Sequence, residues 1–231
     1  GGTDVAGIKS VAKKENGKYY ITGSKFFITS AMVASYFIIF AKTAPELKGK
    51  GITAFLVEKD TPNLRIGPPI RLTGFRGSAI GGIRYDNMPV DEKNVIGKEN
   101  EGIKVALSTL EKGRVNISSL ALGMLQRVYE ESVKFASTRK SMEQPIINYQ
   151  YIQQYLTDML KDLEASRLMV YNTAMLIDQN QNVGMNAAAT KLFVSEALMN
   201  HVVKAVEILG GYGYTRGTVI ERLFRDAHNT T

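Results

Sequence analysis

The chain has 231 residues, of which 44% are hydrophobic and 22% are charged, a balance typical of a globular protein with a substantial core. It contains no cysteine, which excludes disulfides, thiolate metal sites and cysteine nucleophiles and fits a reducing compartment such as the cytoplasm or the mitochondrial matrix. The formal net charge of +7 comes from scattered basic residues, which fit a solvated surface or a positive field that attracts polyanions. Without a nucleic-acid motif, nucleotide ligands are favoured over nucleic acid as the polyanion. No apolar run is long enough to span a membrane, so no membrane is expected as a partner.

Short strand-like runs fill about the first ninety residues. Turn residues such as Asn16-Gly17 and Pro68-Pro69 separate these runs. The expected strands are residues 18–22, 26–29, 36–43, 52–58 and 82–85. Short strands at this spacing are typical of an antiparallel sandwich or small barrel, and we expect such a β-domain over residues 1–97.

From about Glu101 the apolar residues recur every three or four positions instead. This period predicts three long amphipathic helices and a short fourth one. The periodic runs cover residues 103–128, 152–177 and 188–209, and the short helix is expected at about 216–225. Four such helices predict an up-and-down bundle over residues 98–231, so the expected fold class is α+β with two domains.

An arginine interrupts the apolar period of the first predicted helix. The step from Leu110 to Ile117 passes through Arg114. A cation on an apolar stripe must extend to solvent, form an ion pair or face a ligand. Glu111 lies three residues earlier, within reach of an intrahelical ion pair, so a structural Glu111–Arg114 pair is the alternative to a ligand contact.

The ends of the predicted long helices carry further polar residues and glycines. Arg139-Lys-Ser141 closes the first helix, where cations complement the helix dipole and a fixed arginine could instead hold a phosphate. Tyr149-Gln150 lies at the start of the second, where capping alone would explain it. The third helix ends on Gly210 and Gly211, whose backbone can approach a ligand closely.

Three other features of the sequence are weak evidence for a site when each is considered alone. Thr3 belongs to a tight glycine turn at the start of the chain. Phe27 and Thr29 fall on one face of a predicted strand, where an aromatic ring beside a hydroxyl suits a planar ligand or simple core packing. The two histidines, His201 and His228, lack metal-ligand spacing, so no metal site is expected.

In their order along the chain, these motifs resemble the acyl-CoA dehydrogenase family, and the resemblance covers essentially all of the sequence. Its most specific part is Leu209-Gly-Gly-Tyr-Gly213 followed by Arg225-Asp-Ala227. The resemblance implies a β-domain followed by a helical bundle and FAD as the cofactor. It also implies oxidation of an acyl-CoA thioester to the trans-2-enoyl-CoA in fatty acid metabolism. In this family a glutamate removes the α-proton while the β-hydrogen leaves as hydride to the flavin.

The resemblance assigns site residues by position. The residues that it implies for FAD are Thr3, Phe27, Ile28, Thr29, Arg139, Ser141, Tyr149, Gln150, Glu207, Gly210 and Gly211. The residues that it implies for the acyl-CoA substrate are Thr3, Glu111, Lys112, Gly113 and Arg114. Arg139 and Ser141 would hold the adenylate end of FAD across a subunit interface.

The sequence departs from the family pattern at several of these positions. Phe27 stands where tryptophan is usual, and Met142-Glu143 stands where Phe-Gly is usual. Glu207 replaces a glutamine, although a carboxylate beside a diphosphate is repelled unless it is protonated or paired. Gly113 occupies the position at which isovaleryl-type members carry the base, so no catalytic residue is assigned in this chain. The base glutamate is expected beyond Thr231, as in most of the family.

The resemblance also implies partners. We expect a homotetramer, because this family builds its FAD site from two subunits, and an electron-transfer flavoprotein as the electron acceptor. One alternative is another enzyme of the same fold, an acyl-CoA oxidase, a flavin monooxygenase or a nitroalkane oxidase. A second alternative is a non-catalytic homologue that binds CoA or flavin.

Overall fold

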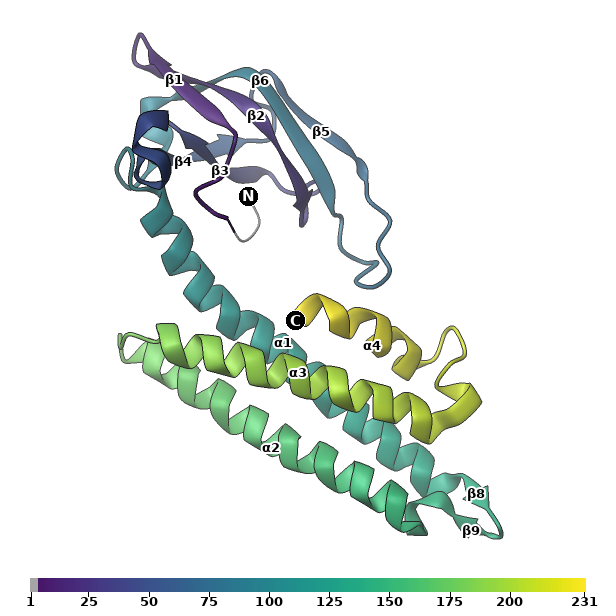
Figure 1. Ribbon diagram of the computed structural model, residues 1–231. Helices are drawn as coiled ribbons and strands as arrows, with labels where there is room; N and C mark the ends of the chain where they lie inside the picture. The colour runs from purple at the N-terminus through teal and green to yellow at the C-terminus, as the bar shows by residue number, and fades with distance from the viewer. Residues whose placement is uncertain (1–3) are drawn as a thin grey trace. The chain divides into compact units, whose positions relative to one another are not determined.

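A computed structural model of the chain describes residues 4–231, which form two compact units. The described chain up to Leu72, together with Arg76–Thr109, forms a unit built on a β-sheet. Thr73–Phe75 and Leu110–Thr231 form a helical unit. Figure 1 shows the strands of the first and the helices of the second. The expected α+β class, with a mostly antiparallel sheet followed by a four-helix domain, is confirmed.

Seven strands form the main sheet, in the order β5-β6-β2-β1-β3-β4-β7. Their bounds are β1 Val11–Glu15, β2 Lys18–Ile28, β3 Tyr36–Lys42, β4 Ile52–Glu58, β5 Leu64–Pro69, β6 Gly81–Asp91 and β7 Val95–Ile96. All neighbours pair antiparallel except β1 and β3, which meet in parallel at Val11 and Lys42. Side chains of the inner face form one core that includes Tyr19, Ile21, Phe55 and Tyr85.

The sheet differs from the sequence-based expectation in four places. The runs 18–22 and 26–29 belong to a single strand, β2, whose pairing with β6 shifts register between Ile21 and Gly23 and again between Lys25 and Ile28. These irregularities break the alternation of buried and exposed residues, so the pattern looked like two strands. Strands β1, β5 and β7 were not expected. β5 lies at an edge of the sheet, where its final prolines are tolerated because an edge strand leaves backbone donors unpaired.

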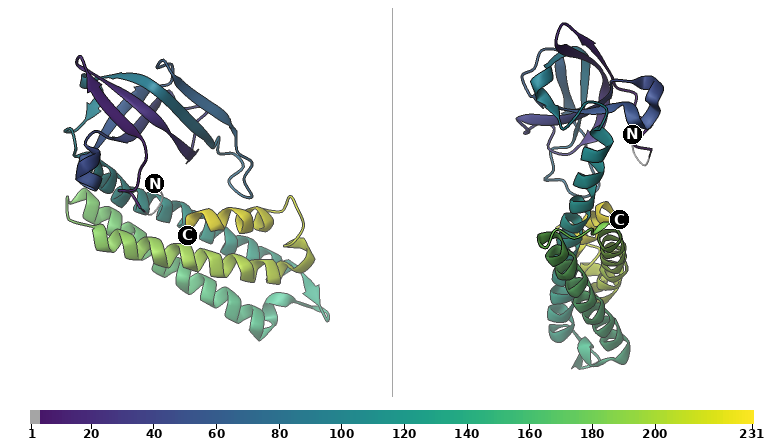
Figure 2. Two further views of the ribbon diagram at one scale, coloured as in Figure 1. Left: turned by 45° about the horizontal axis from the view of Figure 1, so that its top comes forward. Right: turned by 90° about the vertical axis from the view of Figure 1, so that its left-hand side faces the viewer.

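Four α-helices make up the helical unit, with one long helix shared along the chain by both units. Their bounds are α1 Gly102–Thr138, α2 Gln150–Asp178, α3 Gly184–Leu209 and α4 Val219–Ala227, and the hairpin β8–β9 (Lys140–Ser141 and Gln144–Pro145) follows α1. Figures 1 and 2 show α2 and α3 side by side and antiparallel. Apolar side chains from all four helices form one core that includes Leu125, Met159, Leu198 and Ile220.

Polar contacts fix the register between α2 and α3. The hydroxyls of Thr173 and Thr190 are hydrogen-bonded at 2.9 Å in the buried seam. Nearer the other end, Nε2 of His201 lies 2.7 Å from a carboxylate oxygen of Asp162. A buried polar pair must be satisfied by its partner, so each contact disfavours sliding of one helix along the other.

Helix α4 holds the loop segment Thr73–Phe75 inside the helical unit. The amide of Phe75 donates a 2.6 Å hydrogen bond to Oδ1 of Asp226, and Arg225 donates a 2.9 Å bond to the carbonyl of Thr73. A Cβ on Gly74 would lie 2.3 Å from the carbonyl oxygen of Arg225, so the approach requires glycine. The Arg-Asp-Ala motif therefore has a packing role, which sequence reasoning did not find.

Candidate functional site

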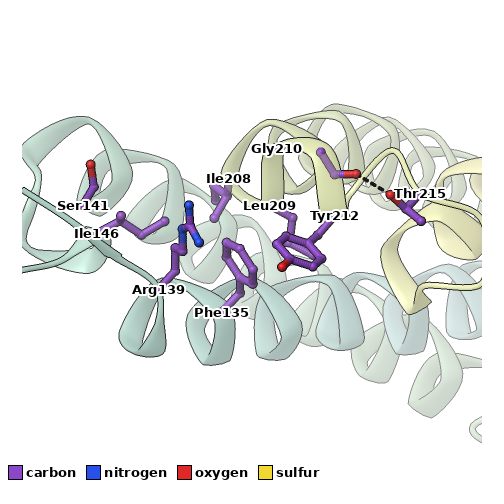
Figure 3. A pocket seen from close by; sticks show the side chains of 10 residues that line it. Phe135, Arg139, Ser141, Ile146, Ile208, Leu209, Gly210, Tyr212 and Thr215 are labelled. Carbon is purple, nitrogen blue, oxygen red and sulfur yellow. Dashed lines mark hydrogen bonds between the residues drawn. The ribbon is translucent and has the colours of Figure 1, made fainter.

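A cavity of about 540 Å³ opens where α1, the β8–β9 hairpin and the end of α3 meet. Figure 3 shows the side chains around it. The lining residues are Phe135, Arg139, Ser141, Ile146, Ile208, Leu209, Gly210, Gly211, Tyr212 and Thr215. Arg139 supplies the only charge among these, so the cavity has an apolar wall and one cationic corner suited to an anion attached to a flat apolar group.

Backbone hydrogen bonds hold Arg139 and Ser141 at the cavity. The amide of Arg139 bonds the carbonyl of Phe135 at 2.8 Å, and the amide of Ile146 bonds the carbonyl of Arg139 at 2.8 Å. The hydroxyl of Tyr149 donates a 2.8 Å bond to the carbonyl of Ser141. The end of α1 and the hairpin after it are thus tied together, which limits the positions available to the Arg139 guanidinium.

The hairpin turns through two residues that rarely adopt its geometry. Met142 and Glu143 have φ values of 47° and 67°, the left-handed values of a tight primed turn. Glycine is the residue best suited to such angles, so both Met142 and Glu143 are strained. Met142 is 88% exposed at the tip.

The glycine pair gives the cavity a bare backbone wall. Gly210 ends α3 with φ 57° and ψ −132°, a conformation that residues with a Cβ disfavour. Gly211 has ordinary φ, and a Cβ there would meet no atom within 4 Å. The hydroxyl of Thr215 donates a 2.6 Å bond to the carbonyl of Gly211 and fixes the turn. Nothing inside the described chain requires glycine at 211, so this stretch of backbone stays open on the cavity side.

Glu207 lies one turn before the glycines but does not line the cavity. Its Oε2 accepts a 2.8 Å hydrogen bond from the hydroxyl of Tyr155, which is itself bonded to the hydroxyl of Tyr151 at 2.7 Å. The bond with Tyr151 and then the bond with Glu207 raise the pKa of Tyr155 well above its usual value. The exposed carboxylate therefore has a protein donor of its own.

Residues 111–114 lie on α1, away from the residues that line this cavity. Arg114 is exposed and forms no ion pair within residues 4–231, so the alternative of a structural Glu111–Arg114 pair is wrong. The placement of Arg114 on a buried stripe is also wrong, because the buried face runs through Val115 and Ala121. Leu110, 47% exposed, lies one turn before Arg114, so this surface combines apolar area with an unpaired cation.

Gly113 lies beside Arg114 in the interior of a helix of 37 residues. A Cβ there would meet no atom within 4 Å. Glycine in a helix interior costs about 1 kcal/mol relative to alanine. Packing within the described chain gives no reason for that loss, and the space next to Arg114 is open.

Phe27–Thr29 lie at the end of β2. Phe27 falls in the register shift before Ile28, with φ 55°, and its ring is 64% exposed. The ring meets Phe26 edge to face at 4.8 Å between centroids. The alternation predicted that Phe27 and Thr29 share one face of a regular strand, and this prediction is wrong. The left-handed residue reverses the side-chain direction, and β2 ends at Ile28. A left-handed backbone at a bulky aromatic residue is strained.

Two family models match the chain: the C-terminal domain of acyl-CoA dehydrogenase over residues 100–231 and the middle domain over residues 1–88. The chain belongs to the acyl-CoA dehydrogenase family. It is 40% identical over 229 residues to "Acyl-CoA dehydrogenase" of Bacillus subtilis, covering 99% of this chain and 60% of that protein.

Solved structures agree with this family assignment. Butyryl-CoA dehydrogenase from Megasphaera elsdenii superposes with a TM-score of 0.97 at 33% identity, covering 99% of this chain and 60% of the other. A chain in the structure of the electron transferring flavoprotein of Acidaminococcus fermentans gives 0.97 at 34% identity, with the same coverage. The chain thus spans about 60% of the length of these relatives.

The cavity of this acyl-CoA dehydrogenase chain gathers four of the residues that the sequence assigned to FAD, namely Arg139, Ser141, Gly210 and Gly211. Tyr149 contacts Ser141 from outside the lining, and Gln150 is the first residue of α2. Neither Phe27–Thr29 nor residues 111–114 line this cavity, and Thr3 lies outside the described residues. The family resemblance did not indicate Phe135 and Tyr212, whose rings lie 5.9 Å apart in the cavity wall. The sequence could have indicated both rings, because Phe135 lies one helical turn before Arg139 and Tyr212 directly follows Gly211.

The described residues provide neither a metal-binding cluster nor a membrane-spanning helix. No group of three or more histidine, cysteine, aspartate or glutamate side chains between residues 4 and 231 could hold a metal ion. Within the same residues no helix is long and apolar enough to cross a membrane.

Proposed function

We propose that this chain is part of an FAD-dependent acyl-CoA dehydrogenase, which converts an acyl-CoA thioester to the trans-2-enoyl-CoA. The observation that carries the proposal is the cavity that combines Arg139 and Ser141 with the bare backbone of Gly210–Gly211, in a chain of this family. A guanidinium and a hydroxyl suit phosphate oxygens, and the Cβ-free backbone suits close approach of a diphosphate. The residues present therefore fit the adenosine diphosphate end of FAD.

Each predicted residue has a proposed part in holding the cofactor. Arg139 and Ser141 bind the diphosphate, and Tyr149 orients Ser141 through its 2.8 Å bond. Gln150 and Glu207 complete the nucleotide site from the adjoining ends of α2 and α3. We assign Thr3 and the segment Phe27–Thr29 to contacts with the flavin ring, where the exposed Phe27 ring can pack against it. The family pattern supports a homotetramer that completes this site from two subunits.

The substrate is proposed to bind at residues 111–114, with Thr3 also in contact. The unpaired Arg114 supplies a cation for the polar part of acyl-CoA, and Gly113 leaves room for the acyl chain. Glu111 and Lys112 line the same stretch of α1. Bound FAD supplies the hydride acceptor, and exclusion of water strengthens the hydrogen bonds that stabilise charge on the thioester carbonyl.

The residue that removes the α-proton is proposed to be a glutamate that follows Thr231 in the longer protein, because glycine at position 113 carries no basic group. The electron acceptor is proposed to be an electron-transfer flavoprotein, a proposal supported by the similarity to a chain in the structure of such a protein from Acidaminococcus fermentans. The lack of cysteine favours a reducing compartment.

The test uses the full-length protein purified from its source. We expect a flavin absorbance band, anaerobic bleaching of that band by acyl-CoA thioesters and formation of trans-2-enoyl-CoA. Rapid peroxide formation in air would instead indicate an oxidase. A colourless full-length protein that does not take up FAD would contradict the proposal and favour the non-catalytic homologue.

A further inference from the structure

The hairpin formed by β5, β6 and their connecting loop has an unusual charge pattern. Its residues 64–85 contain four arginines and no lysine, aspartate or glutamate, and its two carboxylates, Asp86 and Asp91, follow on the last part of β6. The rest of the sheet unit, by contrast, carries lysines and no arginine. Arginine presents a planar fork of donors that matches phosphate oxygens, whereas lysine is a point charge. The hairpin thus concentrates the residue type best suited to bind phosphate.

Two of these arginines line a cavity of about 490 Å³ that is separate from the one beside Arg139. Its lining residues are Pro69, Ile70, Arg71, Leu72, Arg76 and Ser78. Neither Arg71 nor Arg76 forms an ion pair with any residue between 4 and 231. Two guanidinium groups that share one cavity repel each other, and an anion between them would convert that repulsion into attraction.

The loop that carries this pair is tied at its base and at its tip. At the base the amide of Ile70 bonds the carbonyl of Ile80 at 2.9 Å, and the amide of Ile80 bonds the carbonyl of Ser78 at 3.0 Å. At the tip, Thr73–Phe75 is held by Arg225 and Asp226 of α4. The bond between Ile70 and Ile80 closes the loop that carries Arg71 and Arg76, which limits the backbone positions available to both before a ligand arrives. Such preorganisation lowers the entropic loss on binding.

The other two arginines lie opposite one another on the strands. Arg65 of β5 pairs in register with Arg84 of β6, and both are exposed. Two like charges directly opposite on neighbouring strands repel each other. Together they raise the positive potential of the hairpin. The nearest carboxylate along β6 is Asp86, two residues beyond Arg84 and outside the lining of the cavity. Arg65 and Arg84 therefore attract anions without enclosing them.

We propose that the cavity lined by Arg71, Arg76 and Ser78 binds the diphosphate group of a nucleotide. The two guanidiniums can each donate two parallel hydrogen bonds to phosphoryl oxygens, and the Ser78 hydroxyl can donate a further one. Leu72 and Ile70 offer apolar area for the remainder of the ligand. This site shares no residue with the FAD and acyl-CoA sites proposed above, so it does not depend on them.

The test measures protection of individual arginines in the full-length protein with its own cofactor bound. Phenylglyoxal modification is followed by mass spectrometry of the peptides that carry Arg65, Arg71, Arg76 and Arg84, with ADP or inorganic pyrophosphate as the probe. We expect saturable protection of Arg71 and Arg76 by both probes, with little protection of Arg65 and Arg84. Protection by ADP alone assigns the intact nucleotide as the ligand. Equal protection of all four arginines, or of none, would overturn the proposal.

A matched pair of double variants gives a second readout. Arg71→Gln with Arg76→Gln should weaken ADP binding to the full-length protein at least tenfold and lower its dependence on salt. Arg65→Gln with Arg84→Gln removes the same charge from the same hairpin and should change the affinity by less than about threefold. Equal losses in both variants would show a diffuse charge effect rather than a site.

Discussion

The hydroxyl of Tyr155 on α2 donates a 2.8 Å hydrogen bond to Oε2 of Glu207 on α3. This bond places a carboxylate one turn before the glycine pair, where most of the family carries a neutral amide. A negative charge near a bound diphosphate raises the free energy of the bound state through repulsion. The hydrogen bond from Tyr155 offsets only part of that repulsion. The position of Glu207 thus leads to a prediction about the cofactor.

Glu207→Gln should raise the affinity for FAD a few-fold at low salt, because the amide keeps an acceptor for Tyr155 and removes the charge. The gain should shrink at high salt, where screening already weakens the repulsion. FAD titration of the apoprotein at two salt concentrations measures both effects. Weaker binding in the variant would show instead that the carboxylate itself accepts a hydrogen bond from the nucleotide.

Gly210 and Gly211 should respond differently to alanine. Gly210→Ala forces a Cβ onto a backbone with φ 57° and should destabilise the protein by about 1–3 kcal/mol. Gly211→Ala meets no atom within 4 Å and should leave the stability unchanged, while weakening FAD binding roughly tenfold by blocking its approach. Thermal unfolding of the apoprotein and FAD titration separate the two effects. Unchanged FAD affinity in Gly211→Ala would contradict the assignment of that backbone to the cofactor.

Arg114→Ala should reduce acyl-CoA turnover about 10- to 100-fold while leaving FAD bound, as expected for the loss of one charge-assisted hydrogen bond. Steady-state kinetics and flavin content provide the measurement. Arg127→Ala is the matched control, because Arg127 lies on the same helix and pairs with Glu131 at 2.6 Å on the surface. Its removal should cost little, since exposed ion pairs contribute about 0–1 kcal/mol. Turnover that falls equally in both variants would argue against a substrate contact.

The sequence predicted these sites to different extents, for physical reasons. Gly210, Gly211, Arg139 and Ser141, which line one cavity, stood out in the sequence because helix ends are marked locally, by glycine and by cations. The Tyr155–Glu207 bond could not, because it depends on the register between two helices that are far apart in sequence. The same register brings Asp162 to His201, so a histidine without metal spacing turned out to be a buried member of the helix seam.

The spacing of apolar residues also led to wrong predictions at Arg114 and at Phe27. On α1 the spacing placed Arg114 on the buried stripe, yet the buried face passes one position over, through Val115. In a long helix several spacings of three and four are possible, and only packing selects among them. At Phe27 a left-handed residue interrupts the strand period, and aromatic residues give no sequence signal for that conformation.

Acid should destabilise the protein through His201. Burial lowers the pKa of this histidine below its ordinary value of 6.5, an effect that the Asp162 carboxylate partly offsets. As the pH falls below about 6.5, the unfolded chain binds a proton that the folded chain does not, so the free energy of unfolding decreases until the folded pKa is reached. The slope appears in unfolding midpoints between pH 7.5 and 5. His201→Gln should flatten it, whereas His228→Gln, at an exposed position, should not. Equal slopes in both variants would assign the acid sensitivity elsewhere.

The contact between Gly74 and α4 should make a small substitution costly. Gly74→Ala places a Cβ 2.3 Å from the carbonyl oxygen of Arg225, so the loop or the helix must shift, at a cost of about 1–3 kcal/mol. Gly77→Ala, three residues on, meets no atom within 4 Å and should change the stability by less than about 0.5 kcal/mol.

Asp226→Ala removes the acceptor for the Phe75 amide and should destabilise the protein by about 1.5–3 kcal/mol. Because Gly74→Ala and Asp226→Ala disrupt the same contact, the double variant should lose less stability than the sum of the two. Urea unfolding of the four proteins in the cycle measures this coupling. Strict additivity would mean that Gly74 and Asp226 act on stability independently, in spite of their contact.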